Sequence, residues 1–262
     1  MTLVLTRLDL RLRRRILVGT AVGAAAYLLV VVAAYPAFKD DTTLSEMLQS
    51  NSAAAAAFGI NGSITSPAGW LNANMFANFG PLLALMLTIG YGANSIAGQA
   101  GDGLLGLTAA QPVTRAALLQ QKTLALAVTA LVVPVISFAV CLIGPQFDLT
   151  PDWTRLAAVT VSTALLAFDF GAVAMLVGAL TGSKGAALGV ASGLAAAAYL
   201  VSSLAPIIGV VHRLRWGSPF YWAVGDDQLT SGLTWADLLV LVVIAAILTA
   251  ATLPSFRRLD IP

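Results

Sequence analysis

The chain has 262 residues, of which 58% are hydrophobic and only 10% are charged, and its mean hydropathy is +0.87. Soluble domains carry about 25% charged residues, so the composition excludes a soluble protein and indicates an integral membrane protein. The net charge of +2 is too small to indicate nucleic-acid binding. One cysteine excludes an intramolecular disulfide, and one histidine leaves no histidine cluster for a metal site. We expect no metal and no cofactor in this chain.

The first fifteen residues place leucines on one helical face and arginines, including Arg7 and Arg11, on another. This pattern predicts an interfacial helix over 1–15 that lies on an anionic leaflet. The alternation in RLDLRL would also suit a strand, but an isolated strand at a membrane surface leaves its backbone unpaired. The apolar run that follows is longer than the core of a signal peptide, so we predict a first span and not a cleaved leader.

Six apolar stretches follow one another, each close to the ~20 residues that cross a bilayer as a helix. They predict spans at 16–38, 70–96, 123–143, 155–180, 186–208 and 237–253. Ten of the 14 basic residues then fall on one side, which places both termini in the cytoplasm under the positive-inside rule. Segments 39–69 and 209–235 become extracytoplasmic, and 98–122 becomes cytoplasmic. We predict a single all-α membrane domain over 1–262, without the internal repeat typical of many secondary transporters.

Catalytic patterns are missing from the sequence. It contains no paired carboxylates at productive spacing on one side of the membrane and no G-x-x-x-x-G-K-[ST] phosphate-binding motif. The chain is therefore predicted not to be an enzyme. Energy for any transport must come from a partner or from an ion gradient.

The inner segment GQAGDGLLGLTAAQPVTRAALLQQK, residues 98–122, is long and rich in glycine, which suggests a docking surface. It resembles the segment between spans 2 and 3 in membrane subunits of type-2 ABC exporters. Asp102-Gly103 and Pro112-Val113-Thr114-Arg115, with Lys122 behind them, carry that resemblance. Gln99 stands where the family often has glutamate.

Two further stretches, ALTGSKGAALGVASGLAAAAYLV and LRWGSPFYWAVGDDQL, resemble permeases called exporters of polyketide antibiotics. The resemblance implies that 98–122 forms a coupling helix seated in a groove of a nucleotide-binding subunit, with the N-terminal helix beside it. The residues implied in coupling to the ATPase are Gln99, Asp102, Gly103, Pro112, Thr114, Arg115, Arg7 and Arg11.

The resemblance also implies the rest of the assembly. A second permease copy or paralogue and two ATPase subunits, which bind ATP and Mg²⁺, complete the transporter. It works in a bacterial-type plasma membrane and exports an amphipathic or lipophilic compound, antibiotic-like or lipid-like.

Asp169 lies near the middle of the fourth predicted span, where an acid costs at least ~2.5–3.5 kcal/mol. It is a candidate pathway residue, together with Phe168, Phe170 and Met175. The alternative, which we favour here, is a structural carboxyl that is hydrogen-bonded to a serine or threonine on a neighbouring helix.

Two patterns concern packing and the outer face. Small residues at four-residue spacing let helices approach closely, within one subunit or between two, at Gly178, Gly182, Gly185, Gly189 and Gly193. The run Pro219, Phe220, Tyr221 and Trp222 fits interfacial anchoring. By resemblance, it is instead a re-entrant segment that gates the outer exit.

The sequence thus predicts a transport subunit without its own ATPase site. Two alternatives stay open: a proton-coupled secondary carrier that uses Asp169 as its titrating group, and a membrane anchor subunit with no pathway of its own.

Overall fold

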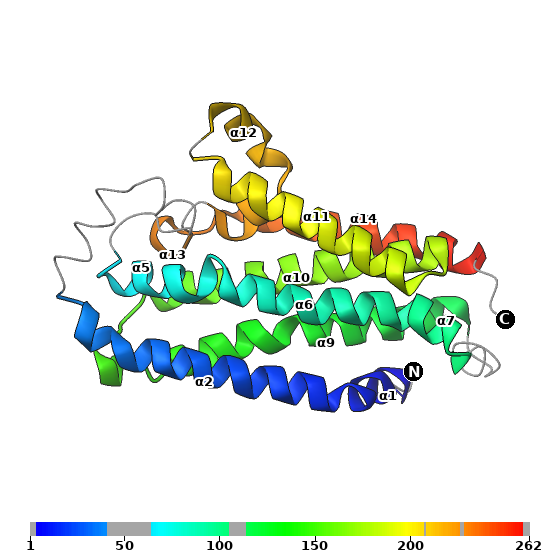
Figure 1. Cartoon of the computed structure of the whole chain (residues 1–262), viewed down its shortest axis with the longest axis horizontal. Helices are drawn as coiled ribbons and strands as arrows, with labels where there is room; N and C mark the ends of the chain where they lie inside the picture. Colours follow the sequence, from blue (N-terminus) through cyan, green and yellow to red (C-terminus); the bar gives the residue numbers. More distant parts are fainter. Residues whose placement is uncertain (1–3, 41–63, 105–113, 207, 226–227, 259–262) are drawn as a thin grey trace.

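The computed structural model describes residues 4–40, 64–104, 114–206, 208–225 and 228–258. Within these ranges six helical stretches are long and apolar enough to cross a membrane, and they lie side by side along the long axis (Figure 1). They are α2 (Arg14–Phe38), the run Pro67–Gly101, α9 (Arg115–Cys141), α10 (Trp153–Thr181), α11 (Lys184–Leu204) and α14 (Trp235–Arg258). The prediction of an all-α fold with six spans is confirmed.

The third span begins earlier than predicted, at Arg115 instead of residue 123. Thr114 has an extended backbone, and its side-chain oxygen accepts a hydrogen bond from the N–H of Ala117 at 3.2 Å, which caps the helix. Before the connection, the second helical run ends at Gly101, and Gly103 has a φ of +71°. Both flanks of the predicted coupling segment 98–122 are therefore helical, and residues 105–113, with Pro112, lie outside the described residues.

Hydropathy missed this early start because the first turns of α9 are polar. Gln120 and Gln121 lower the local average, although the residues around them already follow a helix. Each end of the other spans lies within five residues of the predicted end.

The second span is the most irregular helix of the bundle. It runs through α5 (Pro67–Leu71), a π-turn at Asn72–Phe76, α6 (Phe79–Ala93), a π-turn at Asn94–Gly98 and α7 (Gln99–Gly101). Asn78 breaks it with φ −134°, and its side-chain oxygen accepts a hydrogen bond from the Tyr199 hydroxyl at 2.5 Å. Because π-turns within helices are frequent at functional sites, the two wide turns make the second span a candidate functional element.

Helix α10 is the axis of the bundle. In its most apolar window 67% of the residues are buried, against 11% for α14, and α10 packs against α6, α9, α11 and α14. Contact is closest at Gly92 and Gly171, where a Cβ on Gly92 would lie 2.2 Å from the Gly171 carbonyl oxygen. Only glycine lets the second and fourth spans cross at this distance.

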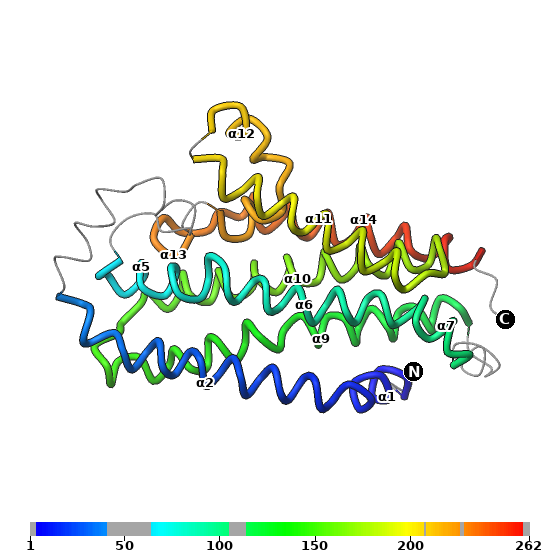
Figure 2. Tube along the Cα trace, viewed as in Figure 1, coloured from blue at the N-terminus to red at the C-terminus, as the bar shows by residue number. Residues whose placement is uncertain are grey.

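The two ends of the bundle differ. Helix α1 (Val4–Leu12), the end of α7 and the last turn of α14 gather at one end, which we call the α1 end; α5 and the turn Gly144–Phe147 lie at the other, the α5 end (Figures 1 and 2). Near the α5 end the Trp70 indole N–H donates to the Val31 carbonyl at 2.9 Å, and Lys39 pairs with Asp148 at 2.8 Å.

Candidate functional site

At the α1 end, helix α1 lies against the start of α9. The Leu5 N–H donates to the Gln121 side-chain oxygen at 2.9 Å, and the Thr6 hydroxyl donates to the Gln121 carbonyl at 3.0 Å. Thr6 and Asp9 are buried, whereas Arg7 and Arg11 are exposed. Helix α1 therefore turns a polar face, with Thr6 and Asp9, onto the bundle, and Leu8 and Leu12 of the predicted leucine face are exposed, as are the two arginines.

A buried polar network holds α1 to the second and third spans. One carboxylate oxygen of Asp9 accepts from the Gln99 amide at 3.0 Å, and the other accepts from the Tyr91 hydroxyl at 2.9 Å. Lys122 Nζ lies 3.5 Å from Asp9 and donates to the Gln99 side-chain oxygen at 2.6 Å. All four side chains are buried. Charges at this depth persist because each has both a counter-charge and hydrogen bonds.

Arg13 joins α1 to the same network. Its guanidinium donates to the Gly90 carbonyl at 2.9 Å and lies over the Tyr91 ring, 5.2 Å from the ring centre. Burial lowers the pKa of Arg13 from its ordinary value, while Tyr91 and Asp9 act in the opposite direction. A guanidinium stays charged in proteins, so Arg13 keeps a positive charge at this half-buried position.

The predicted coupling residues fall into two groups. Asp102 and Gly103 are exposed where the second span ends, and Arg7 and Arg11 are exposed on α1. Gln99 differs from the prediction, because its side chain is buried between Asp9 and Lys122 and does not offer a surface contact.

Thr114 and Arg115 both have contacts within the chain. Thr114 caps α9, and the Arg115 guanidinium donates to the carbonyls of Phe256 at 3.2 Å and Arg257 at 2.7 Å. These carbonyls belong to the last turn of α14, where no intrahelical donor is left for them. Arg115 therefore ties the start of the third span to the end of the sixth.

The sequence analysis did not identify Asp9 or Tyr91, and it used Lys122 for the family resemblance and not as a buried partner of another residue. The available signal was Asp9, the one acid in the basic stretch 3–15. An acid among arginines on an amphipathic helix has its partner on another element when it falls on the buried face.

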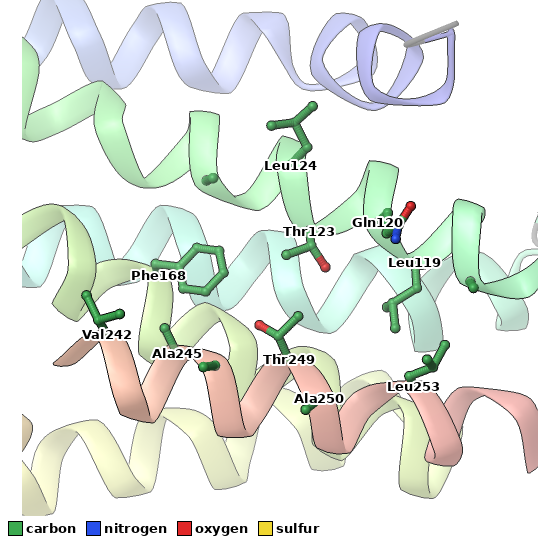
Figure 3. A pocket seen from close by; sticks show the side chains of 13 residues that line it. Leu119, Gln120, Thr123, Leu124, Phe168, Val242, Ala245, Thr249, Ala250 and Leu253 are labelled. Atoms are coloured by element: carbon green, nitrogen blue, oxygen red, sulfur yellow. The ribbon is translucent and has the colours of Figure 1, made fainter. Parts of the chain in front are cut away.

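The four candidate pathway residues have different surroundings in the described part of the chain. Phe168 lines a groove of about 760 Å³ between α9 and α14, beside Thr123, Val242 and Thr249 (Figure 3). Phe170 and Met175 are buried in the core. Because a helix turns by 100° per residue, neighbouring positions on α10 face different elements.

Asp169 is buried, and neither carboxylate oxygen has a hydrogen-bond partner among the described residues. The favoured alternative, a carboxyl bonded to a serine or threonine on a neighbouring helix, is wrong for this conformation. On the same helix, the buried Thr163 hydroxyl also has no hydrogen-bond partner among the described residues, whereas the Thr160 hydroxyl donates to the Leu156 carbonyl at 2.7 Å.

The aromatic run of the outer segment is packed against the bundle. Phe220 is buried against Phe170 and Tyr199, with ring centres at 5.9 and 5.6 Å. The Ser162 hydroxyl on α10 donates to the Ala223 carbonyl at 2.7 Å. Tyr221 is buried, while Pro219 and Trp222 are partly exposed. The chain leaves the bundle at α12 (Gly209–Leu214) and returns to it here (Figure 2).

The predicted packing glycines behave differently from one another. Gly178 packs near Ala97, and Gly182 ends α10 with φ +65°. An added Cβ at Gly189 or Gly193 meets no described atom within 4 Å, and at Gly185 it meets only Ser183, in its own turn. For these three glycines, the alternative of packing within the chain is therefore wrong. Helix α11 turns them outward, and its buried face consists of Ala187, Ala191 and Ala195.

Comparison with curated proteins returned no match. Residues 3–261 match the sequence model of the family described as ABC-2 family transporter protein. The match spans nearly the whole chain and agrees with its six apolar helices, which make it a multi-pass membrane protein. The chain belongs to the ABC-2 transporter family, as a membrane transport component.

Proposed function

We propose that the chain is the permease subunit of an ATP-driven exporter, and that its α1 end docks a separate ATPase subunit. One observation carries the proposal: Asp9, Tyr91, Gln99 and Lys122 bind α1, the second span and the third span into one unit around the 102–114 connection. Displacement of that connection would move three helices together. Membership in the ABC-2 family supports an ATPase as the source of that displacement.

The docking surface would consist of exposed groups around this unit. Asp102 stands at the end of the second span, and Arg7 and Arg11 face outward from α1. Gln99, Thr114 and Arg115 would support the surface from within, since their side chains are bonded to other parts of the chain. ATP and Mg²⁺ would be held by the partner.

The α1 end would face the cytoplasm of a bacterial-type plasma membrane. Arg7, Arg11, Arg115, Lys184 and Arg257 gather there, and the positive-inside rule favours that side. Two permease copies, or the chain and a paralogue, would meet through the outward glycine face of α11. ATP-driven closure of the ATPase pair would then rock the bundles and carry an amphipathic or lipophilic compound outward, past the aromatic outer segment.

The test is a pull-down of the intact protein from native membranes. Arg7→Glu combined with Asp102→Arg should abolish recovery of an ATPase, because both side chains are exposed and neither belongs to the buried network. Arg213→Glu, on the exposed outer helix α12, is the matched charge reversal and should leave recovery unchanged. Absence of an ATPase from the unmodified protein, with the bundle intact, would contradict the proposal.

The second candidate, a proton-coupled carrier, is favoured by a specific observation: the buried carboxyl of Asp169 has no hydrogen-bond partner among the described residues. It predicts transport that continues without ATP and stops when the proton gradient is removed. A membrane anchor without a pathway predicts that neither treatment changes efflux.

A further inference from the structure

A second cavity, of about 320 Å³, lies at the α1 end. Its floor is polar and buried, formed by Asp9, Tyr91, Ser95 and Gln99. Its rim is exposed and contains Leu12, Ile16 and Lys184. Arg13 and Asn94 complete the lining. The cavity is thus a polar chamber that opens beside apolar side chains at the beginning of the first span.

The lining carries an excess of positive charge. Asp9 is already neutralised by Lys122, and its two oxygens accept from Gln99 and Tyr91. Arg13 and Lys184 face the same cavity, and in the described part of the chain no carboxylate lies within 4.0 Å of either. Arg13 donates to the Gly90 carbonyl, which accounts for one of the five N–H donors of a guanidinium.

The position of Lys184 adds to this potential. Lys184 is the first residue of α11, directly after the N-cap Ser183, whose side chain accepts from the Ala186 N–H at 3.3 Å. The N-terminus of a helix carries a partial positive charge, so a lysine there is electrostatically unfavourable for the helix itself. A bound anion would relieve the repulsion between the lysine, the helix end and Arg13.

The rim leads into the membrane along an apolar face. Leu12 and Ile16 are 66% and 59% exposed, and the same face of α2 continues through Gly19 and Gly23 at helical spacing. An added Cβ at either glycine meets no described atom within 4 Å. Beyond the cavity, the described residues therefore leave this apolar face of the first span uncovered.

We propose that this cavity binds the anionic headgroup of a phospholipid from the adjacent leaflet. The phosphate would lie between Arg13 and Lys184, with the Asn94 amide beside it, and one acyl chain would follow Ile16, Gly19 and Gly23 along α2. Guanidinium and ammonium groups form charge-assisted hydrogen bonds with phosphate, and the apolar track favours a phosphate that carries an aliphatic chain. Binding at this site needs no ATPase partner.

The test is native mass spectrometry of the full-length chain in detergent, titrated with dioleoyl phosphatidylglycerol or with dioleoyl phosphatidylcholine. One phosphatidylglycerol should bind at least about tenfold more tightly than phosphatidylcholine, the difference expected for charge-assisted contacts. The double variant Arg13→Gln, Lys184→Gln should lose that preference. The matched control, Arg14→Gln with Arg15→Gln, removes the same charge from exposed positions outside the cavity lining and should keep it.

A second variant keeps the test valid if the double variant does not fold. Lys184→Glu changes one exposed side chain and places an acid at a helix N-terminus, where it is favourable, so folding should be preserved while the preference for phosphatidylglycerol falls.

Three results would overturn the proposal. Equal binding of the two lipids would show that the cavity does not select an anionic headgroup. If the control variant lost the preference for phosphatidylglycerol as fully as the double variant, the preference would come from diffuse surface charge. Displacement of the lipid by soluble glycerol phosphate at the same concentration would make the site one for soluble phosphate. Since neither ATP nor an ATPase is present, these outcomes are independent of the pull-down.

Discussion

Asp9 and Lys122 show how two charges can be retained at the boundary of an apolar bundle. Their side chains are 8% and 3% exposed and lie 3.5 Å apart. Desolvation of each ion costs several kcal/mol, and their attraction offsets this only while Gln99 and Tyr91 supply the remaining hydrogen bonds. The pair is therefore more sensitive to the loss of one member than to the loss of both.

Lys122→Met should destabilise the bundle by about 3–5 kcal/mol, because it leaves the buried Asp9 carboxylate without its ion-pair partner. Adding Asp9→Leu should restore most of the stability. Thermal unfolding of the purified protein in detergent measures both changes. Lys184→Met, at an exposed lysine, should alter stability by less than about 0.5 kcal/mol. A double variant as unstable as Lys122→Met alone would show that the pair is not coupled in this way.

At the scale of elements, the crossing of the second and fourth spans decides the shape of the bundle. Gly92 and Gly171 face each other, and an added Cβ on Gly171 would also meet the Leu126 side chain at 2.4 Å. At Gly92 the atom met is a backbone oxygen of Gly171, so rotation of a neighbouring side chain cannot make room for a larger residue there. Helix α10 can occupy the centre only because these two positions lack a side chain.

Gly92→Ala should weaken the fold, since the new methyl group would lie 2.2 Å from the Gly171 carbonyl oxygen and force the helices apart. We expect a loss of about 1–3 kcal/mol, the usual range for overpacking. Gly90→Ala is the matched control two residues away, where an added Cβ meets no described atom within 4 Å. It should be neutral or stabilising by up to about 1 kcal/mol, because alanine favours helix. Equal unfolding temperatures for Gly92→Ala and Gly90→Ala would contradict the close crossing of the second and fourth spans at Gly92.

At the scale of the whole molecule, the two candidate energy sources, an ATPase and a proton gradient, make different demands on Asp169. Asp169 has no hydrogen-bond partner among the described residues, a costly state for a buried carboxyl. Both a proton-coupled carrier and an ATP-driven permease can contain such a group. Only the carrier needs it to gain and lose a proton in every cycle.

Asp169→Asn keeps the shape of the side chain and removes its ability to titrate. If an ATPase drives transport, efflux from proteoliposomes that contain the whole complex should stay within about twofold of the parent, since Asp169 has no hydrogen bond to lose among the described residues. Efflux should also persist after a protonophore is added. Loss of efflux in the variant, together with sensitivity of the parent to the protonophore, would favour the carrier.

The sequence alone determined the class of fold, because a membrane-spanning helix can be recognised from the apolar composition of a local stretch. A bilayer demands about 20 apolar residues per helix, so six spans and their approximate limits follow without knowledge of any contact. The short motifs of 98–122 likewise indicated the ABC-2 family, which the match over residues 3–261 shows. Polarity misled the prediction at the start of α9, where Thr114 caps a helix whose first turns look like a loop.

Only the tertiary structure decided which polar residues meet. Asp9 and Gln99 are 90 residues apart along the chain, and the neighbours Leu5 and Gln121 are 116 apart. No local pattern pairs them. The same holds for the glycines: spacing suggested α11, whereas the close crossing uses Gly92 and Gly171. Apolar periodicity reports that a helix has a buried face, but the partner of each buried group depends on how helices from distant parts of the chain are assembled.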